Sequence, residues 1–117
     1  MLFTILIYGA EGLAERLPAA EQEALLQKHR DLQAKLQAEG KYRGAVRLMP
    51  PSTAMSVQDK GRGMRVLDGP YAESKEQILG FYLIECETME EAIEAAKALP
   101  QVVAHMEIRP VNWVGGL

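Results

Sequence analysis

Two side chains in the sequence are of types that transfer protons, a histidine at position 29 and an aspartate at position 68. His29 follows Leu25 by four residues and precedes Leu32 by three, so a helix would place it on an apolar stripe. Imidazole titrates near neutral pH, and partial burial beside a carboxylate tunes it for general acid–base catalysis. The alternative, commoner for a lone histidine, is a core residue whose ring nitrogens bond backbone or hydroxyl groups.

Asp68 ends an expected strand and is followed directly by Gly69 and Pro70. An aspartate at a turn commonly accepts hydrogen bonds from backbone N–H groups of that turn. The second interpretation is that its carboxylate orients His29 and stabilises the charged imidazole. The sequence leaves both interpretations open, because the spacing of the two residues does not show whether they meet in the fold.

A charged row lies near the carboxyl end of the chain, where His105, Glu107 and Arg109 alternate with apolar residues. In a strand, this alternation puts all three side chains on one face of the sheet. One interpretation is a solvated face or a charge pair at a dimer rim. The other is an anion site in which Arg109 holds a substrate carboxylate through two parallel hydrogen bonds.

The elements that would carry these residues follow from the apolar pattern and the turn signals. Their order, β-α-β-(β-β)-β-α-β, predicts an α+β fold of the ferredoxin-like, split βαβ type with an extra β-hairpin. We expect strands at 2–8, 42–49, 53–58, 63–68, 79–86 and 102–111, and helices at 18–39 and between the cap Thr88 and the stop Pro100.

The strands expected at 2–8 and 79–86 are apolar at both odd and even positions, so both of their faces should be covered. Two helices can cover only one face of the sheet, and the chain has no further element for the other. A second copy of the chain packed sheet to sheet is the simplest cover. The sequence therefore predicts a homodimer.

Length and composition limit the remaining choices. A chain of 117 residues has single-domain length, so we expect one domain over 1–117. A net charge of −3 and an isoelectric point near 5.4 argue against a duplex DNA or anionic membrane partner. A lone cysteine, Cys86, excludes an internal disulfide and a multi-thiolate zinc site, and suits a cytoplasmic protein. No segment approaches the roughly 20 apolar residues of a membrane span.

A long central motif, DGPYAESKEQILGFYLIEC, together with MEIRPV near the end of the chain, resembles the YCII-related family in its DGPF-type branch. Tyr71 stands where that branch usually has phenylalanine. The first strand and the helix that bears His29 match the family in order and spacing. The residues that carry the resemblance are Asp68–Tyr71, Ala72–Glu76, Gly80–Tyr82, Glu107, Arg109 and Pro110.

The resemblance implies a ferredoxin-like fold that pairs as a dimeric α/β barrel, with an active site formed by a helix histidine and an aspartate. These two residues correspond to His29 and Asp68 in this chain. The wider superfamily contains lactone isomerases, dehalogenases and cofactor-free monooxygenases, which act on small molecules. Genes of the DGPF-type branch often accompany sigma factors of the extracytoplasmic-function type, which implies a partner and not a reaction.

The leading functional prediction is a cofactor-independent enzyme, of the lyase, isomerase or dehalogenase kind, that acts on a small organic anion. His29 and Asp68 are the predicted catalytic pair, and Arg109, His105 and Tyr71 are the predicted substrate contacts. No cofactor or metal is expected. Two alternatives are a non-catalytic ligand-binding or regulatory module associated with a sigma factor, and a structural dimer without a ligand.

Overall fold

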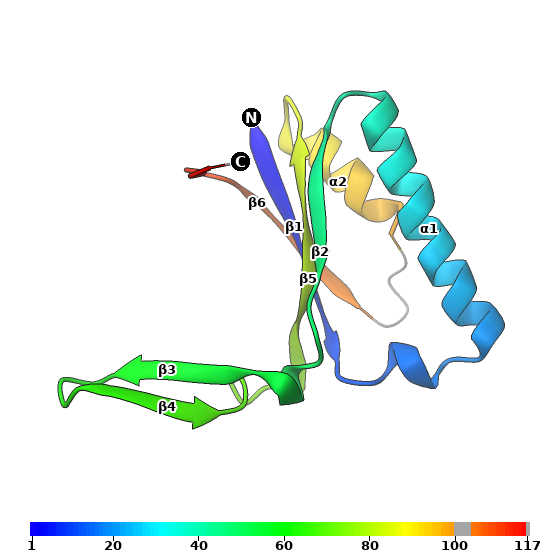
Figure 1. Ribbon diagram of the computed structural model, residues 1–117. Coiled ribbons are helices and arrows are strands. Elements are labelled where there is room, and N and C mark those ends of the chain that lie inside the picture. Colours follow the sequence, from blue (N-terminus) through cyan, green and yellow to red (C-terminus); the bar gives the residue numbers. More distant parts are fainter. Residues whose placement is uncertain (100–103, 117) are drawn as a thin grey trace.

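A computed structural model describes residues 1–99 and 104–116 and shows two helices packed on one face of a four-stranded sheet (Figure 1). A separate two-stranded hairpin extends from the opposite side of the sheet (Figure 1). The strands are β1 (Leu2–Ala10), β2 (Tyr42–Arg47), β3 (Met55–Asp59), β4 (Met64–Asp68), β5 (Glu76–Glu85) and β6 (His105–Pro110). The helices are α1 (Ala19–Ala38) and α2 (Met89–Lys97), with short 3-10 turns η1 (Ala14–Arg16) and η2 (Pro51–Thr53).

The sheet has the strand order β2-β5-β1-β6, and every neighbouring pair is antiparallel. Strands β1 and β2 are therefore parallel to each other with β5 between them, which is the split βαβ arrangement. This topology confirms the predicted α+β fold of ferredoxin-like type. The extra hairpin, β3 with β4, is also confirmed and forms a sheet of its own.

The boundaries of the helices agree closely with the sequence pattern. Helix α1 begins after Pro18, and the expected cap of α2 is present, since the Thr88 side chain accepts a hydrogen bond from the Glu91 N–H. The Glu91 carboxylate accepts from the Glu87 N–H, one residue before the cap. The expected stop at Pro100, and the part of the last strand placed at 102–103, lie outside the described residues.

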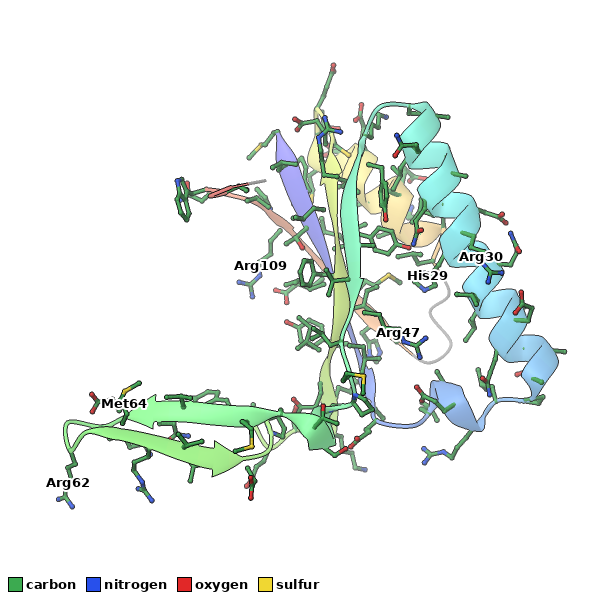
Figure 2. All side chains as sticks on the ribbon, viewed as in Figure 1. His29, Arg30, Arg47, Arg62, Met64 and Arg109 are labelled. Carbon is green, nitrogen blue, oxygen red and sulfur yellow. The ribbon has the colours of Figure 1, made fainter. Side chains whose placement is uncertain are left out.

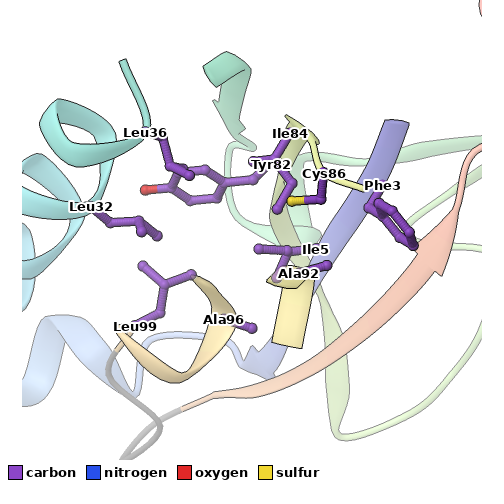
Figure 3. Close-up of a cluster of buried hydrophobic side chains, with 10 residues drawn as sticks. All are labelled: Phe3, Ile5, Leu32, Leu36, Tyr82, Ile84, Cys86, Ala92, Ala96 and Leu99. Carbon is purple, nitrogen blue, oxygen red and sulfur yellow. The ribbon is translucent and has the colours of Figure 1, made fainter. Parts of the chain in front are cut away.

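The core lies between the helices and one face of the sheet (Figure 3). Two isoleucines, Ile5 on β1 and Ile84 on β5, are completely buried there. Because alternate strand residues point to opposite faces, the odd residues of β1 and the even residues of β5 supply this layer. The buried set is Phe3, Ile5, Leu32, Leu36, Tyr82, Ile84, Cys86, Ala92, Ala96 and Leu99.

One glycine sets the distance between two strands that carry the site. A Cβ atom at Gly80 of β5 would lie far inside van der Waals distance of the carbonyl oxygen of Val46 on β2. No side chain fits that space without moving one of the strands. Gly80 therefore allows β2, and Arg47 at its end, to lie close against β5.

The opposite face of the sheet, which we call the outer face, is covered by neither helix of the described part of the chain (Figure 1). The strand register places apolar side chains there, and Val46 is 43% exposed. The hairpin also has one apolar face, because its pairing register brings Val57 opposite Val66. That face carries Met55, Val57, Met64 and Val66, each more than half exposed.

Candidate functional site

His29 lies on the side of α1 that faces the sheet and is half-buried. Its Nδ1 is 2.8 Å from the hydroxyl oxygen of Tyr82, which rises from β5. The two rings are stacked, with centroids 5.8 Å apart and planes inclined by 16°. Side chains alternate between the two faces of β5, and this alternation places Tyr82 on the face beneath α1. His29 lies above Tyr82 because it shares the buried helix face of Leu32 and Leu36.

Tyr82 is 2% exposed, so its hydroxyl depends on protein partners. The Gln33 side chain, one turn after His29 on α1, donates from Nε2 to this hydroxyl over 3.1 Å. Burial raises the pKa of Tyr82, the hydrogen bond from Gln33 opposes that rise, and the nearby Tyr42 adds to it. The phenol is therefore neutral at physiological pH.

Arg47, the last residue of β2, supplies positive charge to the same region. In Figure 2 the His29 side chain leaves α1 toward the sheet, and the Arg47 side chain leaves β2 toward α1. Burial lowers the pKa of His29 from its usual 6.5, and the charge of Arg47 lowers it further. Arg47 forms an exposed ion pair with Glu15 of η1, with Nη2 and Oε1 3.3 Å apart.

His29, Gln33, Arg47 and Tyr82 lie together on the helix-covered side of the sheet, and we call them the His29 cluster. The guanidinium of Arg47 has N–H groups in the planar fork that carboxylates fit. Its partner Glu15 is exposed, so the ion pair is one that a ligand carboxylate can replace. Neutral imidazole beside it has one nitrogen, Nε2, that no described residue bonds.

Asp68 lies elsewhere in the single chain. It ends β4, opposite Met55 of β3, and its side chain is on the apolar face of the hairpin. No hydrogen bond within residues 1–99 and 104–116 uses its carboxylate, and none joins it to His29. Backbone bonds hold the adjacent turn instead, since the Gly69 N–H donates to the Ala54 carbonyl oxygen over 2.8 Å.

The charged row of β6 lies on the outer face, as the alternation predicted. His105 Nδ1 is 2.9 Å from a carboxylate oxygen of Glu76, at the start of β5. Arg109 pairs with Glu107 over 2.8 Å, and this carboxylate raises the pKa of the guanidinium. The four-stranded sheet therefore separates Arg109 and His105 from His29 within one chain.

Tyr71, the remaining predicted contact, is 82% exposed in the turn after the hairpin. Beside this turn lies a hollow of about 260 Å³, lined by residues such as Pro51, Pro70 and Ile78. A second hollow of about 300 Å³ lies between α1 and α2, where Lys35 and Glu94 are among its lining residues. Neither hollow is lined by His29.

Three residues of the His29 cluster, Tyr82, Gln33 and Arg47, were not predicted from the sequence as site residues. Gln33 carried a signal, because it follows His29 by four residues and so shares its helix face. Tyr82 is within the motif that carried the family resemblance. Arg47 gave no sequence signal, because only the strand pairing of β2 with β5 places it on the helix-covered face.

Two structural observations bear on metals and membranes. The described residues include no group of three or more histidine, cysteine, aspartate or glutamate side chains placed to hold a metal ion. Among the same residues, no helix has both the length and the apolar character needed to cross a membrane.

The fold and the His29 cluster together define a ferredoxin-like α+β protein with a histidine–tyrosine pair under its first helix. A sequence model of the YCII-related domain matches residues 1–113. An uncharacterised protein of Rhizobium meliloti (strain 1021) is 33% identical over 114 residues, which cover 95% of this chain and 92% of that protein. The chain belongs to the YCII-related family, which confirms the resemblance of its central motif.

Proposed function

We propose that this protein binds a small organic anion at the His29 cluster and catalyses a cofactor-independent acid–base reaction on it, of the lyase or isomerase kind. The observation that carries the proposal is the placement of a neutral, half-buried imidazole beside the exposed guanidinium of Arg47. Arg47 holds the carboxylate of the ligand, and His29 faces the part of the molecule where charge or a proton moves.

The anion site moves, in this proposal, from Arg109 to Arg47. Both arginines have a carboxylate partner, Glu107 for Arg109 and Glu15 for Arg47. Only Arg47 projects from the helix-covered face, where His29 lies (Figure 2). Of these two arginines, Arg47 is therefore the one that can contact a substrate bound at His29 of the same chain.

The proposal is tested by calorimetric titration of a panel of small organic carboxylates into the wild-type protein and two matched variants. Arg47→Gln removes the charge beside His29, and Arg109→Gln removes the same charge from the outer face. We expect Arg47→Gln to weaken binding about tenfold or more, because hydrogen bonds to charged groups stabilise complexes by about 1.5–3 kcal/mol. Equal effects of the two variants, or no binding by any member of the panel, would contradict the proposal.

The predicted homodimer belongs to the same proposal, with the outer face and the hairpin as its interface. A two-stranded hairpin is at best marginally stable alone, and this one leaves Val57 and Val66 58% and 62% exposed. A second copy of the chain has a matching apolar sheet face, so it covers both surfaces at once. Asp68 lies on the same hairpin face, so formation of the dimer would bury the side chains around Asp68.

Asp68 remains a predicted catalytic residue on this basis. Because Nδ1 of His29 is bonded to Tyr82, the carboxylate would act at the Nε2 side, on the imidazole or on the substrate. Asp68→Asn should then lower turnover without changing the secondary structure or the mass of the dimer. Unchanged turnover in this variant would remove Asp68 from the site.

The dimer itself is tested by sedimentation equilibrium. Paired substitutions Val57→Asp and Val66→Asp place two carboxylates on the apolar face of the hairpin, and we expect them to produce monomers with unchanged circular dichroism. The matched control exchanges Gln58 and Arg65, on the other hairpin face, for aspartate, and should leave the dimer intact. A wild-type protein that is monomeric at micromolar concentration would contradict the proposed interface.

A non-catalytic ligand-binding module is the second candidate function. The observation in its favour is that a neutral phenol, and not a carboxylate, bonds Nδ1 of His29 in the chain. Such a module would bind the same carboxylates, and the binding would survive exchange of His29 for glutamine. The proposed association with a sigma factor belongs to this candidate, and co-purification of the two proteins would support it.

A further inference from the structure

We propose that Tyr82 is a positioning residue that fixes His29 as the Nε2–H tautomer, with Gln33 donating to the Tyr82 hydroxyl and leaving its hydrogen for Nδ1, so that His29 donates a hydrogen bond to an oxygen atom of the ligand. This inference rests on the proposed function for the identity of the site and adds the role of His29 and the class of ligand. The ligand class is a carboxylate with a carbonyl group beside it, a 2-oxo acid.

The hydrogens of the cluster determine the tautomer. The Tyr82 hydroxyl has one hydrogen to donate, and it accepts one hydrogen from the Gln33 amide. His29 Nδ1, at 2.8 Å, is the acceptor available for the hydroxyl hydrogen among the described residues. A buried hydroxyl whose hydrogen has no acceptor is costly, so Tyr82 donates to Nδ1. Neutral imidazole with a bare Nδ1 carries its hydrogen on Nε2.

The Nε2–H tautomer determines what His29 can do. A nitrogen that already carries a hydrogen is a donor, so Nε2 cannot accept a proton from a substrate carbon in this state. It can hydrogen-bond a carbonyl oxygen and stabilise the negative charge that develops there when a neighbouring C–H bond is broken. A neutral imidazole in this electrophilic role is known from other enzymes, where a separate carboxylate is the base.

The ligand class follows from the two donors of the cluster. Arg47 has several N–H groups and a full positive charge, which suits a carboxylate. His29 has one neutral N–H, which suits an uncharged oxygen acceptor such as a carbonyl. The cluster holds both donors on the helix-covered face (Figure 2). A 2-oxo acid presents a carboxylate and a carbonyl oxygen side by side, so one small molecule satisfies both.

The tautomer is measured by long-range ¹H–¹⁵N correlation NMR of the imidazole rings at pH 8, where the lowered pKa of His29 leaves its ring neutral. The chain has two histidines, so the His105→Gln variant assigns the His29 signals. We expect a protonated Nε2 and a bare, hydrogen-bonded Nδ1. A protonated Nδ1 in the wild-type protein would overturn the inference.

Exchange of Gln33 gives the sharper test, because it reverses the direction of the hydrogen bonds. The Gln33→Glu variant carries an ionised carboxylate at pH 8, and this carboxylate accepts the Tyr82 hydrogen. Tyr82 then accepts from His29, and the imidazole changes to the Nδ1–H tautomer. In the control Gln33→Met, Tyr82 still donates to Nδ1 and the wild-type tautomer persists. If Gln33→Glu leaves the tautomer unchanged while the protein is folded, Tyr82 and Gln33 do not determine it.

The ligand class is tested with pyruvate and propionate, two three-carbon carboxylates that differ in the 2-oxo group. We expect pyruvate to bind about three- to tenfold more tightly, as one added hydrogen bond implies, and Gln33→Glu to abolish the difference. Equal affinities for the wild-type protein would overturn this class. The tautomer is measured without ligand, so failure of the proposed function and failure of the hydrogen-bond assignment give different results.

Discussion

The two histidines of the chain lie on opposite faces of one sheet, and their surroundings give them different chemistry. His29 lies beneath a helix, bonded to the hydroxyl of a buried tyrosine, with an arginine nearby. His105 is exposed on the outer face and bonds the Glu76 carboxylate. The sheet therefore separates an imidazole that is packed against a tyrosine and held neutral by burial from one that bonds a carboxylate on the surface.

The largest expected effect concerns the packing that creates the covered face. Ile84→Ala removes a completely buried side chain of β5 and should lower the free energy of unfolding by about 2–5 kcal/mol. Leu83→Ala, its neighbour on the outer face, is the matched control and should cost less in the monomer. Urea denaturation measures both. If both substitutions lower the free energy of unfolding equally at low protein concentration, the helix-covered face and the outer face of the sheet are packed alike.

A smaller effect is expected at the contact that brings Arg47 close to β5. Gly80→Ala places a methyl group against the Val46 carbonyl oxygen, and should destabilise the fold by about 1–3 kcal/mol. The strands must separate to admit it, so Arg47 should also move relative to His29. Thermal unfolding measures the stability. An unchanged melting temperature would show that β2 adjusts without strain.

A smaller effect again is expected from His29 on the pH dependence of the free energy of unfolding. The folded-state pKa of His29 is lowered, so the unfolded chain binds more protons than the folded one below about pH 6.5. Stability contributed by neutral His29 is present above that pH and falls as the pH drops toward the lowered folded-state pKa. His29→Gln should therefore show a shallower loss of stability on acidification, measured by denaturation at several pH values. An unaltered pH profile would contradict burial of the neutral form.

The smallest effect is expected for the charged row of the outer face. The Glu107–Arg109 pair is solvent-exposed in the single chain, so a double-mutant cycle with glutamine at both positions should give a very small coupling at low protein concentration, where the chain is monomeric. Higher salt should reduce it further. A clear coupling that survives high salt in the monomer would contradict an exposed pair.

The sequence predicted the fold well because its signals are local. The apolar runs and the cap at Thr88 each specify an element, and the order of the elements restricts the topology. The site was predicted less completely. The helix stripe indicated the burial of His29, but its partners Tyr82 and Arg47 come from strands far away in sequence.

The predicted pairing of His29 with Asp68 relied on the family resemblance and not on spacing. Within the chain, Asp68 lies on the exposed hairpin, and the imidazole bonds a phenol. Strand parity alone could not indicate Arg47 as a site residue. The sequence shows which residues of a strand share a face, but only the register of the assembled sheet shows which face the helices cover.

The most direct test of the account is a pH titration of the His29 imidazole by NMR in the folded wild-type protein, with His105→Gln for assignment. We expect a midpoint below the usual 6.5, because burial and Arg47 both disfavour the charged ring, and a higher midpoint in Arg47→Gln. A wild-type midpoint at or above 6.5, or one that ignores the loss of Arg47, would contradict a neutral imidazole coupled to that guanidinium.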